Sequence, residues 1–209
     1  MSMTISKTIT PQNDADGLAA SQTPAAGGVQ SLTLAGALMS GGVFTATDAG
    51  HLMVIACAAD ETSRTFTVTG TDIRGMAITD AITGVDTASA TGVRYFKTVT
   101  GITVDDDTTG AITVGVVGKC SSDWILANWA SSNFKLGFSC DIGAGTFSVQ
   151  HTQADLQTNS DLNELAHNHA SIAAKTADDS GSYDYPIRGI RMIFTAYTSG
   201  TGTFKVTQS

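Results

Sequence analysis

The sequence predicts an all-β protein, built as a β-sandwich of jelly-roll-like character, and three observations support this class. Short runs between Thr65 and Val117 alternate apolar residues with threonine at a period of two, as half-buried strands do. Turns rich in glycine and aspartate separate these runs. Apolar residues make up 42% of the chain and charged residues only 14%, well under the usual quarter or so. Such a composition suits stacked sheets with hydroxyl-rich surfaces.

The N-terminal segment, residues 1–30, is rich in Thr, Gln, Ala and Gly and shows no sustained period. It carries little to bury, so ordering it alone would cost more conformational entropy than it recovers. We therefore expect a flexible N-terminal arm over residues 1–30. The alternative is an arm that orders against a partner, as terminal segments of assemblies often do.

A first β-sandwich module is expected over residues 31–119. The continuous apolar run Gly50–Cys57 is short and β-branched, which favours a buried strand over a helix. Two alternating strands follow, joined by a turn at Asp72–Gly75. A third strand ends at Val104, and its alternation slips at Thr100–Gly101, which predicts a β-bulge. A last strand over residues 112–116 completes the module.

The pattern pauses at residues 118–123, and we expect a second β-sandwich module over residues 120–209. Its alternating segments are Phe134–Cys140, Phe147–His151, Tyr183–Thr198 and Thr203–Val206. The hairpin at residues 95–114 shows a weak sequence similarity to the hairpin at residues 185–206. An internal duplication would explain this similarity, and so would two unrelated hairpins that each close a sheet. Two separate domains and one jelly roll both remain open, because single-domain jelly rolls of this length are common.

Residues 153–170 interrupt the β pattern and are the one segment with helical character. Asp161 and Glu164 resemble a capping box, with Leu162 and Leu165 as apolar contacts. We expect one short helix within a long connection.

The charge balance argues against nucleic acid and membrane partners. The net charge of −8 arises from 19 acidic and 11 basic residues, whereas binding to nucleic acid requires basic patches that replace phosphate counterions. The arginines are dispersed along the chain at Arg64, Arg74, Arg94, Arg188 and Arg191. The N-terminus lacks the apolar core of a signal peptide, and the apolar run Leu52–Ala59 is too short to span a bilayer. We expect synthesis in a reducing cytoplasm.

The spacing of the candidate metal ligands gives little support for a metal site. Asp105–Asp107 supplies carboxylates that Ca²⁺ accepts, but the EF-hand spacing is absent and Asp is a normal turn residue. We interpret it as a solvated hairpin tip, and Asp178–Gly181 likewise. Zinc needs three or four convergent ligands, and the histidines are His51, His151, His167 and His169. His167 and His169 share a face only on a strand and fall in the least strand-like region, so we expect loop histidines and no metal site.

The three cysteines, Cys57, Cys120 and Cys140, form no CxxC pair and leave an odd count, which disfavours a disulfide framework or a zinc knuckle. Cys140 falls on the apolar side of its strand, so we expect a buried thiol.

No catalytic constellation is visible in the sequence. There is no GxSxG motif and no cysteine in a supporting context. Neither Glu61 nor Glu164 pairs with an aspartate as glycosidases require, and Gly143–Gly145 lacks the lysine of a phosphate-binding loop. Asp80 interrupts an apolar face and is expected to reach a sheet edge or an arginine. We expect no enzyme activity, no catalytic residues and no cofactor.

Trp124 and Trp129 are the candidates for a sugar-stacking platform. They lie five residues apart beside apolar residues at the start of the second module. A tryptophan in that setting is more often a core or interface anchor, and we favour that role.

The segments TFTVTGTDIRGMAITDAITG and YFKTVTGITVDDDTTGAITVG resemble a recurring signature in small virion-associated proteins of tailed bacteriophages. Phe147–Thr152 resembles the V-x-H-T strand of these proteins, and Tyr185–Arg191 resembles their [YF]-P-[VI]-x-x-[IV]-R strand. Thr195–Gly200 is similar to their closing hairpin. The resemblance spans residues 50–208, and residues 153–170 depart from it.

The resemblance implies a structural virion protein, and a capsid decoration (cement) protein before others. Its implied partners are the major capsid protein or other virion proteins, with self-association into dimers or trimers. The protein would be made in the host cytoplasm and reside in the virion. The alternative from another class is a receptor- or glycan-binding module of a tail fibre or adhesin, which predicts an exposed indole at Trp124 or Trp129.

Overall fold

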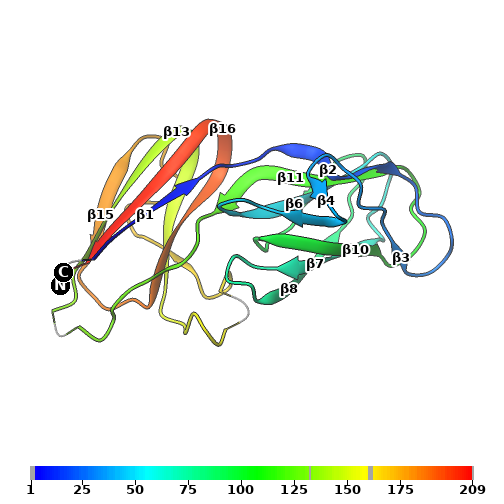
Figure 1. Cartoon of the computed structure of the whole chain (residues 1–209). Helices are drawn as coiled ribbons and strands as arrows, with labels where there is room; N and C mark the ends of the chain where they lie inside the picture. Colours follow the sequence, from blue (N-terminus) through cyan, green and yellow to red (C-terminus); the bar gives the residue numbers. More distant parts are fainter. Residues whose placement is uncertain (1–2, 132, 160–161, 209) are drawn as a thin grey trace. The chain divides into compact units, whose positions relative to one another are not determined.

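A computed structural model describes residues 3–131, 133–159 and 162–208 (Figure 1). None of these residues is helical, and their strands form two antiparallel sheets, which confirms the predicted all-β sandwich class. The chain divides into two compact units. We call Gln12–Val117 the inserted unit, because it interrupts the split unit formed by Met1–Pro11 and Gly118–Ser209. The division falls at the start of the predicted pause at residues 118–123.

The inserted unit holds two sheets. One is the six-stranded sheet of order β4-β5-β10-β7-β8, with β3 added to β10. The other consists of β2, β11, β6 and β9, which belong to the ten-stranded sheet that also includes the strands of the split unit. The strands are β2 (Asp14–Gln22), β3 (Gln30–Ser31), β4 (Met39–Ser40), β5 (Val43–Thr45), β6 (Gly50–Cys57), β7 (Thr65–Thr71), β8 (Ala77–Thr83), β9 (Ser89–Thr91), β10 (Thr98–Val104) and the first part of β11 (Ile112–Ser121).

The core of the inserted unit contains apolar side chains from both of its sheets. Phe66 and Val68 of β7 are fully buried, and so are Ile55 of β6 and Val114 of β11. The intervening threonines of β7 remain half-buried or exposed, as the alternation predicts. The predicted bulge is also confirmed, since the register of β10 against β7 shifts between Val99 and Gly101.

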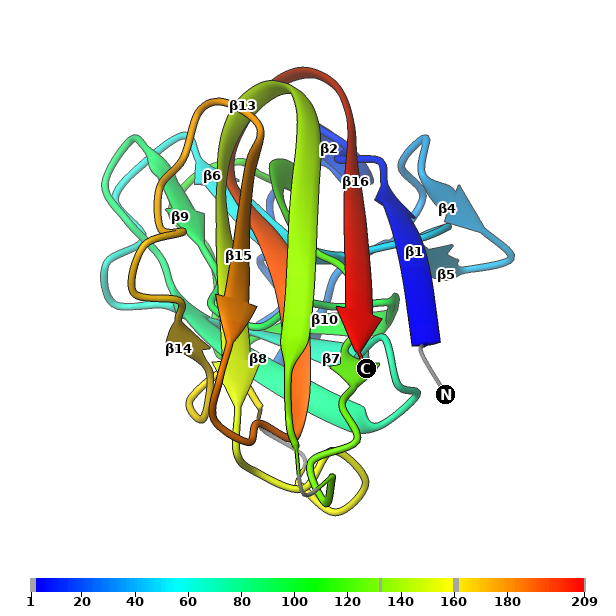
Figure 2. The same cartoon turned by 90° about the vertical axis from the view of Figure 1, so that its left-hand side faces the viewer.

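The split unit is organised around two long strands. They are β13 (Leu136–Thr152) and β16 (Gly189–Gln208), and the shorter strands are β1 (Met3–Ile9), β12 (Ile125–Leu126), β14 (His167–Asn168) and β15 (Asp179–Tyr183). β13 and β16 pair from Leu136↔Gln208 to Thr152↔Gly189, with register shifts near residues 142–147. Figure 2 shows both strands curving over the top of the unit and descending on its other side. One bent ribbon therefore supplies both layers.

Glycines permit the close approach of the two strands at this bend. A Cβ at Gly143 would lie 2.8 Å from the carbonyl oxygen of Ser199 and 3.0 Å from Cα of Gly200. Gly200 itself has φ of +88°, a conformation that residues with a side chain rarely adopt. The side chains of Phe147, Phe194 and Val206, which lie on these two strands, are buried.

Residues 1–30 differ from the expected flexible arm. β1 pairs along its whole length with β16, from Met3↔Gln208 to Ile9↔Gly202, and β2 pairs with β11. Ile9 and Leu18 are completely buried. The few apolar residues of this segment thus enter cores that the rest of the chain has built, and that burial together with the ladder hydrogen bonds offsets the ordering entropy.

The prediction of a short helix within residues 153–170 is wrong, because none of the described residues of this segment is helical. They form turns and the two-residue strand β14, while Asp161, the expected cap, lies outside the described residues. Asp, Asn, Ser and Thr are dense in this segment and favour turns over helix. Its apolar residues instead make tertiary contacts, since Leu162 is buried and Leu156 covers Gly189. No helix long and apolar enough to cross a membrane occurs in the described parts of the chain.

Candidate functional site

The acidic turn Asp105–Asp107 binds backbone amides of neighbouring segments. The hydrogen bonds run from Gly27 N to Asp107 Oδ1 (2.7 Å), from the side-chain Nε2 of Gln30 to Asp107 Oδ1 (2.6 Å), from Gly28 N to Asp106 Oδ1 (3.1 Å) and from Thr65 N to Asp105 Oδ1 (3.0 Å). The backbone N–H groups of Asp107 and Gly28 lower the pKa of the Asp106 carboxyl. We expected this turn to be a solvated hairpin tip, but its carboxylates also accept hydrogen bonds from residues 27–30. These bonds help to explain why the N-terminal segment is ordered.

Two buried carboxylates have similar structural roles. Asp80 is 4% exposed, and its Oδ2 accepts the backbone N–H groups of Val93 and Arg94 at 2.8 and 3.0 Å. We expected Asp80 to reach a sheet edge or an arginine, whereas these two partners are backbone N–H groups. Glu61 is fully buried, and its Oε1 accepts the N–H of Gly110 at 2.7 Å. Both groups hold loops of the inserted unit in place.

Three of the histidines gather in the split unit. His151 lies on β13 directly opposite His167 on β14, so His167 sits in a strand and not in the expected loop. Aromatic contacts link the histidines to two tyrosines. The ring-centroid separations are 5.9 Å for His151–His167, 4.9 Å for His151–Tyr183, 4.9 Å for His169–Tyr183 and 5.9 Å for His151–Tyr185. We call these five residues the His–Tyr cluster.

Hydrogen bonds and burial keep the centre of the His–Tyr cluster neutral. The Tyr183 hydroxyl lies 3.0 Å from His151 Nδ1. Burial raises the pKa of the Tyr183 hydroxyl well above its ordinary value, with a smaller effect from Tyr185. Burial, followed by the nearby His167 and His169, lowers the pKa of His151. The protonated phenol can donate to Nδ1 of His151 in the tautomer that carries the ring proton on Nε2.

The His–Tyr cluster does not form a metal centre. Over the described ranges, no group of three or more His, Cys, Asp or Glu side chains is placed to hold a metal ion. His169 Nε2 instead lies 3.2 Å from the Ser182 carbonyl oxygen. The pairing of β14 with β13 brings His151 and His167 together. Tyr183 ends β15, which pairs with the other end of β13 at Leu136, so its contact with His151 arises from tertiary packing. In the sequence, the only sign of this cluster was the pair His167 and His169, which are separated by one residue.

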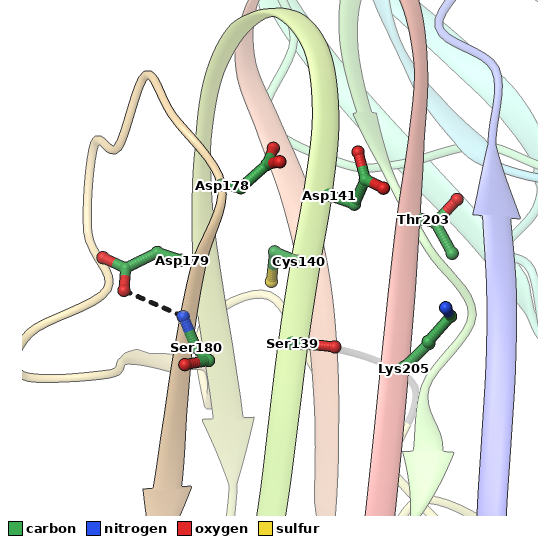
Figure 3. Close-up of a pocket in the computed structure, with 8 residues that line it drawn as sticks. All are labelled: Ser139, Cys140, Asp141, Asp178, Asp179, Ser180, Thr203 and Lys205. Atoms are coloured by element: carbon green, nitrogen blue, oxygen red, sulfur yellow. Dashed lines mark hydrogen bonds between the residues drawn. The ribbon is translucent and has the colours of Figure 1, made fainter.

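A shallow cavity of about 380 Å³ lies on the outer face of the split unit (Figure 3). Its lining residues are Ser139, Cys140, Asp141, Asp178, Asp179, Ser180, Thr203 and Lys205. Asp178 Oδ1 accepts the N–H of Ile142 at 2.9 Å, and Asp179 pairs with Lys175 at 2.9 Å.

The cysteine of this cavity is an inert thiol at neutral pH. Burial, with a contribution from Asp179 and Asp178, raises the pKa of Cys140 to about 12. The thiolate is the nucleophilic form of cysteine, so Cys140 is not activated for covalent chemistry. Burial also raises the pKa of Cys57. All three cysteines are buried and unbridged, as the odd count suggested.

The two tryptophans have different environments. Trp124 is 8% exposed and packs under the Arg191 guanidinium, whose carbon lies 4.5 Å from the ring centroid. Trp129 is 47% exposed, and the guanidinium of Arg188 lies 4.8 Å from its ring. Arg188 also pairs with Asp155 at 3.0 Å. One indole is a core anchor, and the other is available at the surface.

A uniform surface of hydroxyl and methyl groups lies on the inserted unit. Threonine and alanine side chains alternate outward from three adjacent strands, β8, β7 and β10. We call this surface the threonine face, and it consists of Thr65, Thr67, Thr69, Thr71, Ala77, Thr79, Ala81, Thr83, Thr98, Thr100 and Thr103. Thr71 and Thr98 form a hydroxyl pair at 2.7 Å. The face offers hydroxyl and methyl groups without ionised ones.

Comparisons with known proteins assign no family. No protein-family model matches the chain, and no curated protein does. Solved structures with some likeness include an allantoicase from Saccharomyces cerevisiae, at 10% identity and TM-score 0.24, covering 78% of this chain and 74% of that one. A protein of Parabacteroides distasonis described as secreted has 8% identity and TM-score 0.27, covering 100% and 89%. The stem and receptor-binding domain of spike protein P1 from bacteriophage PM2 has 10% identity and TM-score 0.17, covering 99% and 97%. Scores this low carry no functional argument.

Proposed function

We propose that the protein is a non-enzymatic structural component of a tailed-phage particle, which decorates the capsid through protein–protein contacts. The sequence signature in residues 50–208 supports the phage assignment by resemblance. The observation that carries the structural role is the threonine face, a charge-free sheet surface exposed on a protein of net charge −8. Contact with another protein desolvates hydroxyls there and not ions, which is far less costly.

Several of the polar groups that the sequence offered as candidates for chemistry are engaged in holding the fold. Asp80 and Asp105–Asp107 accept backbone N–H groups, and Cys140 is protonated. The major capsid protein is the expected partner. A standard protein interface covers about 800 Å² on each partner, and many copies on a symmetric shell would add avidity to individually weak contacts.

The test is the composition and structure of purified particles. We expect peptides of this chain in the virion by mass spectrometry and density for its two units on the capsid by electron microscopy. Particles assembled without it are expected to lose resistance to heating and to regain it when the purified protein is added. Absence of the chain from purified virions would refute the proposal.

A glycan-binding role is the second candidate, and the exposed Trp129 favours it. Sugar rings stack on exposed indoles, and the neighbouring Arg188 and Asp155 supply a hydrogen-bond donor and acceptor for hydroxyl groups. If this role holds, glycan-array binding should fall at least tenfold in Trp129→Ala. The matched variant Leu126→Ala, at a residue that is 57% exposed, should retain binding. An array with no signal for the unmodified protein removes this candidate.

A further inference from the structure

We infer that the His–Tyr cluster is a pH-sensitive switch, in which protonation of His151 releases the edge strand β14 from β13. The neutral cluster holds this part of the split unit closed, and acid opens it. The inference concerns the isolated chain, so it holds or fails independently of whether the protein is found in virions.

The centre of the cluster joins the two ends of the bent strand β13. Tyr183 pairs with Leu136, the first residue of β13, whereas His151 is the last residue but one of the same strand. β13 bends between these two positions (Figure 2). The Tyr183 hydroxyl and His151 Nδ1 lie 3.0 Å apart, and the two side chains are 1% and 9% exposed. This buried contact therefore links the two layers of the split unit.

A second proton on the His151 ring disrupts this contact. When Nδ1 accepts the phenol proton, the neutral ring carries its own proton on Nε2, so the second proton enters at Nδ1. Nδ1 then becomes a donor, and the hydroxyl hydrogen of Tyr183 loses its acceptor. Among the described residues, His151 is the one hydrogen-bond partner of this hydroxyl. A buried donor that loses its partner destabilises the closed state.

The groups around His151 also disfavour a positive charge on its ring. His167 lies directly opposite on β14, with the two ring centroids 5.9 Å apart. On the other side, the neighbouring Gln150 binds the guanidinium of Arg191 at 2.9 Å. Burial, followed by His167 and His169, lowers the pKa of His151. In the described ranges, none of these three imidazoles forms an ion pair with a carboxylate.

The carboxylates of the flanking elements do not compensate such a charge. Asp179 pairs with Lys175 at 2.9 Å, and Asp155 pairs with Arg188 at 3.0 Å. The remaining carboxylates beside the cluster are exposed, and water and salt screen their charge. The charged groups on the elements that flank the cluster are Asp155, Glu164, Lys175, Asp179, Asp184, Arg188 and Arg191.

β14 is the element that yields when this charge appears. It has two exposed residues and ends the strand order of its sheet. Beside the two-residue ladder, it is held by the bond from His169 N to Val149 O (2.8 Å) and by that from Gln150 Nε2 to Asn168 Oδ1 (3.0 Å). Short edge segments with exposed hydrogen bonds open at a low free energy. Opening brings the histidine rings into water, where the charged form is hydrated.

The direction of the pH effect follows from the two states of His151. Burial keeps its pKa below the ordinary value in the closed state, and exposure to water restores a pKa of about 6.5 in the open state. The open state therefore takes up the proton first. Neutral His151 favours closure above about pH 6.5, and below that pH the opening equilibrium rises by up to about tenfold per pH unit.

Amide hydrogen exchange of the full chain, followed by NMR and corrected for the intrinsic effect of pH, tests this inference. We expect the protection factors of the His167 and His169 amides to be threefold to about tenfold lower at pH 5.5 than at pH 7.5. Amides that join β13 to β16 at Phe138–Cys140 should keep their protection. In His151→Gln, whose side-chain oxygen can still accept the Tyr183 hydroxyl, the protection of β14 should be equal at both pH values.

A titration of the imidazole NMR signals supplies a second measurement that does not depend on the folding of His151→Gln. His151 should titrate below pH 6.5 in the unmodified chain and closer to 6.5 in His167→Gln, which removes the neighbouring ring. His51→Phe is the matched control, because it removes a buried histidine from the inserted unit and should leave the response of β14 unchanged. Equal protection of β14 at pH 5.5 and pH 7.5 would overturn the inference. So would a pH response that persists in His151→Gln, or a His151 ring that titrates at or above pH 6.5.

Discussion

Acidification from pH 6.5 to pH 4 is expected to remove about 3 kcal/mol of stability from the inserted unit through His51 alone. His51 is 1% exposed, and burial lowers its pKa from 6.5 to about 4, partly opposed by Asp48 and assisted by Lys97. Its pKa is therefore lower in the folded than in the unfolded chain, so the unfolded chain takes up the proton first. The contribution of neutral His51 to the free energy of unfolding is therefore present above pH 6.5 and is lost as the pH falls toward 4.

The variant His51→Phe isolates this effect. The His51 ring packs edge-on against Phe44 at 6.3 Å, and its Nδ1 is buried without a hydrogen-bond partner, so a phenyl ring suits the site. Urea unfolding followed by circular dichroism, at several pH values, should show a pH-dependent loss about 3 kcal/mol smaller than in the unmodified chain. Val29→Phe, at an exposed residue of the same unit that carries no titratable group, should keep the original slope. Parallel curves for His51→Phe and the unmodified chain would contradict the prediction.

Gly202→Val is expected to destabilise the split unit by about 3 kcal/mol or more, at the upper end of overpacking effects. A Cβ at Gly202 would lie 2.6 Å from Met192 Cε and 2.6 Å from Phe194 Cε2. The Met192 side chain can yield, but the ring of Phe194 is fully enclosed in the core. Valine would therefore push apart the two layers that the bent ribbon forms.

Tryptophan fluorescence measures this second effect directly, because Trp124 and Trp129 both belong to the split unit. Gly137→Val is the matched control on the paired strand β13, since a Cβ at Gly137 meets no atom within 4 Å. The control should change stability by less than about 0.5 kcal/mol. Equal urea midpoints for the two variants would show that Gly202 is not a packing constraint.

Local patterns predicted the strands because their alternation is a property of neighbouring residues. Phe66, Val68, Ile78 and Ile82 face one core because a strand turns its side chains to alternate sides. The slip at Thr100–Gly101 predicted the bulge for the same reason. Composition likewise predicted the hydroxyl-rich surface that appears as the threonine face.

The N-terminal segment and the histidines could not be predicted in this way. The order of β1 and β2 depends on partners that follow much later in the sequence, such as Gly202–Gln208 for β1 and the Asp107 carboxylate for residues 27–30. The His–Tyr cluster likewise depends on the pairing of β14 with β13. A one-dimensional pattern carries no information on such distant pairings.

The sequence by itself thus determined the fold class, the approximate positions of β6, β7, β8 and β10, and the charge-free outward side of β7, β8 and β10. Tertiary structure alone decided that the chain forms an inserted and a split unit, and that the acidic turn fastens the N-terminal segment. It also decided that Trp129 is exposed while Trp124 is buried. The physical reason is that alternation and composition are local, whereas burial and hydrogen-bond partnership depend on which distant strands meet.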